Sequence, residues 1–179
     1  MIEVVNIVGS GSIDTEFDLE KVADDIGSVA EYEPNIYPGM YLRFEEDAPL
    51  ITLYRTGKFI VTGADSEKEA YAIRERFLKL LVEKEMITNP DDEWFQIQNL
   101  VCTAELGESL NLNALAIGFG LENTEYEPEQ FPGLIYRPTG LNCVFLIFGS
   151  GRIVITGCRT VQEAEQGFSE LKSAIEATL

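Results

Sequence analysis

The side chains of this chain that could do chemistry are its carboxylates, three cysteines and a group of aromatic residues. Histidine is absent, which removes the usual general base and excludes Ser-His or Cys-His nucleophilic catalysis. Cys102, Cys143 and Cys158 have no CxxC spacing and sit in apolar stretches, so we expect buried free thiols in a reducing cytosol. The carboxylates could hold a hard cation, but no EF-hand-like run is present. We therefore expect no metal, no cofactor and no enzyme, since nothing singles out a catalytic pair of carboxylates.

The aromatic residues occur in a sequence motif that is present twice in the chain. EYEPNIYPGMYLR spans residues 31–43, and EYEPEQFPGLIYR spans residues 125–137, 94 residues later. Pro132 and Gly133 should fix the loop backbone so that the ring of Phe131 stands out from its surroundings.

Other segments repeat in the same order. VVNIVGS matches IQNLVCT, and LITLYRTGKFIVTG matches VFLIFGSGRIVITG. Each copy then ends in a helix-like stretch that opens with the spacing of a capping box. The sequence therefore predicts a duplication rather than a repeat array. We place the first copy at 1–88, an acidic linker at 89–95 and the second copy at 96–179.

The charge is strongly and evenly acidic. The net charge is −18, with 18 acids and 9 bases in residues 1–90 and 13 acids and 4 bases in residues 91–179. Such a balance ordinarily argues against nucleic acid as a partner. We interpret it as adaptation to concentrated salt, where the Debye length falls to about 3 Å. A generic acidic surface is the alternative. No apolar run spans a bilayer and no signal peptide is visible, so we expect a cytoplasmic protein.

The predicted strands are apolar on both faces. Phe145 and Ile147 should face the helices, which leaves Val144, Leu146 and Phe148 on the other side of an antiparallel sheet. The same alternation gives that second face the following residues: Val4, Asn6, Val8, Thr52, Tyr54, Ile60, Thr62, Ile97, Asn99, Val101, Val154 and Thr156. A broad apolar patch of this kind marks a binding site. The chain has too few helices to cover both faces of the sheet. Two candidates therefore remain for what binds the second face: another copy of the chain, which would form a dimer through the sheet, or the minor groove of DNA. In that groove a few Asn and Thr donors suffice, because A·T pairs offer only acceptors.

The chain resembles the TATA-binding proteins of archaea, and more narrowly those of haloarchaea. The motifs EYEPEQFPGLIYR, LIFGSGRIVITG and IQNLV carry the resemblance, together with their divergent partners in the first copy, and it covers essentially the whole chain. It implies an α+β fold: a saddle-shaped, pseudo-two-fold duplicated domain. Its curved antiparallel sheet would have about ten strands, with helices on the convex face.

The resemblance also implies roles for residues. Phe131 and Phe148 match the pair that wedges between base steps, while Tyr37 and Tyr54 stand where the family has phenylalanine. Glu127 and Glu129 lie in the loop that meets transcription factor B in the family. The positions that match DNA-contacting residues are Asn6, Val8, Tyr37, Arg43, Thr52, Tyr54, Lys58, Ile60, Thr62, Asn99, Val101, Phe131, Arg137, Leu146, Phe148, Arg152, Val154 and Thr156.

We therefore expect a general transcription initiation factor that binds and bends A·T-rich TATA-box DNA through the minor groove. It would recruit transcription factor B and, indirectly, RNA polymerase. We expect a monomer on DNA, and a dimer stays open for the free protein. The alternative is a specialised regulatory paralogue that acts mainly through protein partners, because Tyr37, Tyr54 and Thr52 depart from the family pattern.

Overall fold

The fold is known from a computed structural model, which describes residues 1–89 and 93–179. Of the predicted linker 89–95, residues 90–92 lie outside the described part. The chain divides into two compact units, which we call unit 2 (residues 6–98) and unit 1 (residues 1–5 and 99–179).

The order of elements repeats, as the sequence predicts. The series β1 α1 β2 β3 β4 β5 α2 is followed by β6 α3 β7 β8 β9 β10 α4. All strands belong to one ten-stranded antiparallel sheet in the order β2-β3-β4-β5-β1-β6-β10-β9-β8-β7, which confirms the predicted strand number and duplication. The first series comprises β1 (Glu3–Ile13), α1 (Leu19–Ile26), β2 (Ala30–Glu31), β3 (Met40–Leu42), β4 (Leu50–Leu53), β5 (Lys58–Ala64) and α2 (Glu67–Glu83). The second comprises β6 (Glu93–Glu105), α3 (Leu112–Phe119), β7 (Thr124–Glu125), β8 (Leu134–Tyr136), β9 (Val144–Ile147), β10 (Arg152–Cys158) and α4 (Val161–Thr178).

The two long helices begin at the predicted capping boxes. The Ser66 hydroxyl accepts from the Glu69 backbone N–H at 3.1 Å, and the Thr160 hydroxyl accepts from the Glu163 N–H at the same distance. The two glutamates reach back in turn to the backbone N–H groups just before the caps. Orphan donors at each helix start are thereby satisfied from both directions, which fixes where α2 and α4 begin.

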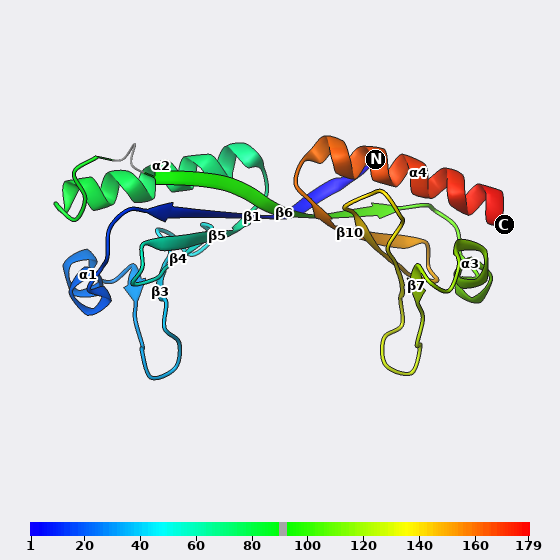
Figure 1. The fold of residues 1–179 in the computed structure, drawn as a ribbon, viewed down its shortest axis with the longest axis horizontal. Helices are drawn as coiled ribbons and strands as arrows, with labels where there is room; N and C mark the ends of the chain where they lie inside the picture. The colour runs from blue at the N-terminus through cyan, green and yellow to red at the C-terminus, as the bar shows by residue number, and fades with distance from the viewer. Residues whose placement is uncertain (90–92) are drawn as a thin grey trace. The chain divides into compact units, whose positions relative to one another are not determined.

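In unit 2 the helix α2 lies along the strands β1 and β5 (Figure 1). The side chain of Phe59 on β5 is fully buried, with its ring 5.4 Å from that of Phe77 on α2 and stacked 5.8 Å from Phe95 on β6. The apolar stripe of α2 therefore covers one face of the strands. The loop 32–39 extends away from that helix (Figure 1).

Unit 1 repeats this plan with α4 and the loop 126–133 (Figure 1). The helix approaches the strands closely because Gly167 has no side chain: an added Cβ would lie 2.9 Å from Cys143 and 3.2 Å from Phe145. Here one prediction is wrong. Cys143 and Cys158 form a disulfide rather than two free thiols, since β9 and β10 bring their Cα atoms to 5.1 Å, within disulfide range. Cys102 is free and buried, as expected.

Candidate nucleic-acid interface

The face of unit 1 that lacks a helix carries a row of side chains across four strands. Thr103 of β6 pairs with Val154 of β10, which pairs with Leu146 of β9, which pairs with Ile135 of β8. All four are partly exposed, whereas their neighbours along β6, β9 and β10 are buried, as is Leu134 before Ile135 on β8. The period-two pattern therefore separates a helix-covered core from an accessible apolar surface.

An aromatic pair stands at the outer end of this row. The carbonyl oxygen of Glu127 accepts from the backbone N–H groups of Gln130 and Phe131, both at 2.9 Å, and so turns the loop 126–133 back toward the sheet. The ring of Phe131 then meets that of Phe148 edge-on, with centroids 5.8 Å apart. A Cβ on Gly133 would lie 2.9 Å from Phe131 and 3.1 Å from Phe148, so only glycine leaves room for both rings.

Unit 2 carries the equivalent row with more hydroxyl groups. Ser10 of β1 pairs with Ile60 of β5, Ile60 with Thr52 of β4, and Thr52 with Tyr41 of β3. The expectation that Thr52 is accessible is wrong, because its side chain is only 7% exposed. Thr52 is crowded by the aromatic pair of this unit: an added Cβ on Gly39 would meet Thr52, Tyr37 and Tyr54 within 3.2 Å.

That aromatic pair consists of two tyrosines joined by their hydroxyls. The hydroxyl of Tyr37 hydrogen-bonds that of Tyr54, and the rings are edge-on with centroids 6.1 Å apart. Tyr41 stacks on Tyr37 at 5.3 Å with the planes nearly parallel. The hydrogen bond with Tyr37, followed by burial, raises the pKa of Tyr54 to about 12. The Tyr54 phenol therefore keeps its proton at neutral pH.

The hairpins that carry Tyr54 and Phe148 have the same backbone. The Tyr54 N–H donates to the Lys58 carbonyl at 2.8 Å, and the Phe148 N–H donates to the Arg152 carbonyl at 3.0 Å. Each turn contains a glycine at positive φ, 91° at Gly57 and 92° at Gly151. A Cβ at either glycine would lie 2.1 Å from a backbone oxygen, so both turns require glycine. The two aromatic pairs are therefore presented in the same way.

The two predicted asparagines hold a fixed orientation. In unit 1 the Oδ1 of Asn99 accepts from the Gly157 N–H at 2.8 Å, and its amide also contacts the Thr156 hydroxyl at 3.2 Å. In unit 2 the Oδ1 of Asn6 accepts from the Gly63 N–H at 2.8 Å. Because each acceptor oxygen is held by the backbone, the Nδ2 group of Asn6 remains as a donor, and that of Asn99, which donates one N–H to the Thr156 hydroxyl, keeps its second N–H.

The remaining predicted residues lie on or beside these faces. Val8 and Thr62 in unit 2 and Val101 in unit 1 are partly exposed. The basic residues Arg43, Lys58, Arg137 and Arg152 are exposed at strand ends. Arg137 forms an ion pair with Glu125 at 2.9 Å, a contact that the sequence analysis did not anticipate. Glu127 and Glu129 are exposed in their loop.

Ile97 is not on the accessible face, contrary to the expected alternation. Its side chain is 8% exposed, while Gln98 and Asn99 are both partly exposed. The pairing of β6 with β10 also shifts register between Ile155 and Cys158. The extra residue of this irregularity lies on β10, where the successive residues Thr156 and Gly157 are both partly exposed.

Several residues of the accessible faces were not predicted from the sequence. In unit 2 a hollow of about 800 Å³ lies over β1, β5 and the start of β6. Ser10 and Ser12 continue the alternation that begins at Asn6, and Tyr41 and Ile135 are equivalent positions of the two copies, so period-two extension would have found all four. Trp94 is 53% exposed at the rim of this hollow, and neither the alternation nor the repeat predicts its place there. The hollow is lined by Val8, Ser10, Ser12, Thr56, Lys58, Ile60, Trp94 and Gln98.

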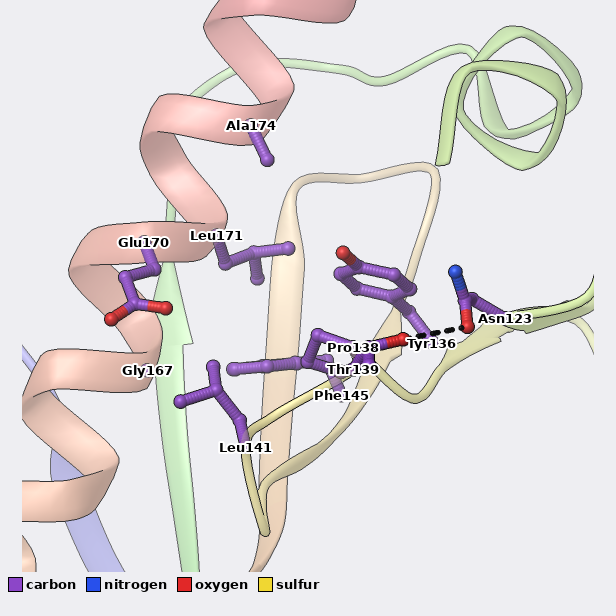
Figure 2. A pocket seen from close by; sticks show the side chains of 10 residues that line it. All are labelled: Asn123, Tyr136, Pro138, Thr139, Leu141, Phe145, Gly167, Glu170, Leu171 and Ala174. Atoms are coloured by element: carbon purple, nitrogen blue, oxygen red, sulfur yellow. Dashed lines mark hydrogen bonds between the residues drawn. The ribbon is translucent and has the colours of Figure 1, made fainter. Parts of the chain in front are cut away.

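Two other hollows are lined in part by carboxylates. On the helix side of unit 1, a hollow of about 360 Å³ lies between α4 and Tyr136, with Thr139 hydrogen-bonded to Asn123 on its far side (Figure 2). Burial, and then the nearby Glu170, raises the pKa of Tyr136, but Glu170 is the one carboxylate in the lining. In unit 2 a second hollow holds Glu16, which pairs with Arg55 at 3.1 Å, and Asp18, which caps α1. These carboxylates have structural partners.

Residues 1–89 and 93–179 contain no cluster of three or more His, Cys, Asp or Glu side chains that could hold a metal ion. No helix in the same residues is long and apolar enough to cross a membrane.

The chain is similar in sequence and fold to known proteins. Residues 1–84 and 94–177 match the family model of transcription factor TFIID, or TATA-binding protein. The chain is 45% identical to TATA-box-binding protein C of Halobacterium salinarum, covering 98% of this chain and 97% of the relative. It is 44% identical to TATA-box-binding protein 2 of Haloferax volcanii, covering 98% and 94%. The solved structure of the Methanococcus jannaschii TBP matches with a TM-score of 0.82 and 40% identity, covering 98% of each chain.

Proposed function

The chain belongs to the TATA-binding protein family of non-enzymatic, DNA-binding transcription factors, and from this premise we propose that it binds A·T-rich promoter DNA through the minor groove and bends it. The observation that carries the proposal is the pair of oriented asparagines. Asn6 and Asn99 each have Oδ1 held by a backbone N–H, so each offers Nδ2 donors from the accessible face. Adenine N3 and thymine O2 are the acceptors that such donors fit in the minor groove.

The aromatic pairs support the bending part of the proposal. Phe131 and Phe148 in one unit, and Tyr37 and Tyr54 in the other, stand edge-on at the ends of the apolar rows. Rings inserted between base steps unstack them and kink the duplex, and the bend then lets the apolar rows contact sugars and bases. Specificity would come mainly from the ease with which A·T-rich DNA deforms.

The acidic charge shapes how the protein would bind. Most DNA-binding proteins release counterions and lose affinity as salt rises. A chain of net charge −18 must instead hold cations between itself and the phosphates, alongside Arg43, Lys58, Arg137 and Arg152. We expect binding to persist or strengthen toward molar salt.

The test is fluorescence anisotropy of a labelled TATA-box duplex titrated with the protein from about 0.2 M to about 3 M KCl. A scrambled G·C-rich duplex serves as the control. Selective binding that survives at high salt supports the proposal. Equal binding of the two duplexes, or no binding at any salt, contradicts it.

We further propose that the protein recruits transcription factor B, and through it RNA polymerase, by the exposed loop 126–133. Glu127 and Glu129 lie on this loop, and the matching loop of the other copy has Glu33 but Asn35. Glu127→Ala with Glu129→Ala should weaken capture of transcription factor B on promoter DNA, while Glu33→Ala should not. Equal effects of the two changes would contradict the assignment.

A specialised regulatory paralogue is the second candidate, and the tyrosine pair favours it. The Tyr37 and Tyr54 hydroxyls make the DNA face of unit 2 more polar than that of unit 1, where phenylalanines stand at the same positions. Binding of transcription factor B without selective binding of a TATA duplex would support this candidate over the first.

A further inference from the structure

Unit 2 gathers hydroxyl groups at positions where unit 1 has hydrocarbon. Tyr37, Tyr54 and Tyr41 occupy the places of Phe131, Phe148 and Ile135. The backbone around the two sets is the same, from the loop turns to the glycine hairpins. The difference between the two ends of the binding surface is therefore chemical and not geometric.

The hydroxyl pair has hydrogen-bonding capacity left over after its internal bond. Each phenol has one O–H donor and an oxygen that accepts. The bond between Tyr37 and Tyr54 uses one donor and one acceptor, so the pair retains one donor and accepting capacity on both oxygens. The raised pKa of Tyr54 keeps the proton on its hydroxyl at neutral pH. The ring of Tyr37 is braced by its stack on Tyr41, so the pair is pre-oriented.

In the minor groove this capacity matches one chemical group. A·T and T·A pairs show only acceptors there, whereas G·C adds the N2 amino group of guanine as a donor. Against a phenylalanine ring that amino group loses its water and gains no partner, which is costly. Against the tyrosine pair it meets an acceptor.

Resting on the function proposed above, we infer that the Tyr37–Tyr54 hydroxyl pair accepts a hydrogen bond from the guanine amino group. The end of the DNA site that meets unit 2 would then tolerate a G·C pair, whereas the end that meets Phe131 and Phe148 requires A·T. Tyr37 and Tyr54 are therefore specificity-determining residues. They also orient the protein on a box with a G·C pair at one end.

The experiment measures the Kd of four proteins for four duplexes by anisotropy at one salt concentration. The duplexes carry an A·T box, the same box with G·C at the terminal step of one end, with G·C at both ends, and with inosine·cytosine at one end. Inosine·cytosine lacks only the amino group of G·C in the minor groove. The proteins are the native chain, Tyr37→Phe/Tyr54→Phe, Phe131→Tyr/Phe148→Tyr, and Tyr71→Phe. The last is a control that removes a phenol hydroxyl from α2.

Ratios within each protein give the result, so changes in overall affinity cancel. The native chain and Tyr71→Phe should bind the one-end G·C box within about twofold of the A·T box, because the protein can turn to place the tyrosine pair there. The two-end G·C box should bind about fivefold weaker or more, the factor of one ordinary hydrogen bond. Tyr37→Phe/Tyr54→Phe should already lose about fivefold on one-end G·C, and inosine should restore the loss. Phe131→Tyr/Phe148→Tyr should tolerate G·C at both ends.

Two outcomes overturn the inference, and they differ from each other. An equal loss on one-end G·C for the native chain and Tyr37→Phe/Tyr54→Phe overturns the inference alone. Failure of the native chain to prefer the A·T box over the scrambled G·C-rich duplex, measured in the titration proposed above, overturns the proposed function and the inference with it. Near-ultraviolet circular dichroism of each variant separates a change of specificity from a loss of fold.

Discussion

Unit 1 and unit 2 have one backbone plan and two surface chemistries. The loop turns, hairpin glycines and capping boxes recur at equivalent residues, and each asparagine is held by an equivalent glycine N–H. Across the accessible row, however, Leu146 and the phenylalanine pair of unit 1 are replaced in unit 2 by Thr52 and the tyrosine pair. The comparison teaches that duplication preserved the scaffold, while the side chains that would face a ligand diverged.

The largest expected difference between the units is in the aromatic pairs. Phe131→Ala should weaken TATA-duplex binding by about tenfold or more, because a ring stacked on bases contributes about 1–3 kcal/mol. Tyr37→Ala should cost less, since it also relieves the dehydration of the phenol hydroxyls. Anisotropy titrations of the two variants side by side measure the difference. A larger loss for Tyr37→Ala would reverse the comparison.

A smaller difference is expected at the asparagines. Asn99→Ala leaves the part-buried Gly157 N–H without its acceptor and should lower the free energy of unfolding by about 1–3 kcal/mol. Asn6→Ala exposes the Gly63 N–H to water and should cost about 1 kcal/mol or less. Denaturant unfolding measures both, with Asn113→Ala, an exposed change on α3, as the control. Equal costs would mean that the two amides are equally buried in solution.

The smallest expected effect concerns alkaline pH. The pKa of Tyr54 is raised from 10.0 to about 12, so the protonated pair stabilises unit 2 below pH 10. That contribution is lost as the pH rises from 10 through 12. The ultraviolet absorbance of ionised tyrosine should show one late-titrating phenol, and Tyr37→Phe should move it toward its ordinary pKa. A native chain without a late phenol would show that the two hydroxyls are not bonded in solution.

Much of the fold could be predicted because each pattern found in one copy of the duplication is supported by the equivalent pattern in the other copy. Ser66 with Glu69 and Thr160 with Glu163 gave the starts of the long helices, and the glycine turns gave the hairpins. Period-two alternation placed Leu146, Val154 and Thr156 on the accessible side of β9 and β10. These features depend on local backbone chemistry, which the sequence carries directly.

The features that could not be predicted depend on tertiary contacts. The burial of Thr52 results from the tyrosines packed beside it, and the burial of Ile97 departs from the alternation that the sequence predicts for its strand. The Cys143–Cys158 disulfide requires two strand ends to meet, although the residues are 15 apart in sequence. Likewise, the hydrogen bond between the Tyr54 and Tyr37 hydroxyls depends on the position of the loop that carries Tyr37, which the sequence does not show.

We have proposed that this chain recognises DNA through the minor groove, and replacing base pairs of the TATA box tests that proposal. Replacing every A·T pair of the box with inosine·cytosine preserves the acceptors of the minor groove and changes the pattern of the major groove. The account predicts that anisotropy will give nearly the same Kd for the two boxes and a much weaker one for a G·C box. Binding of the inosine·cytosine box as weak as that of the G·C box would contradict it.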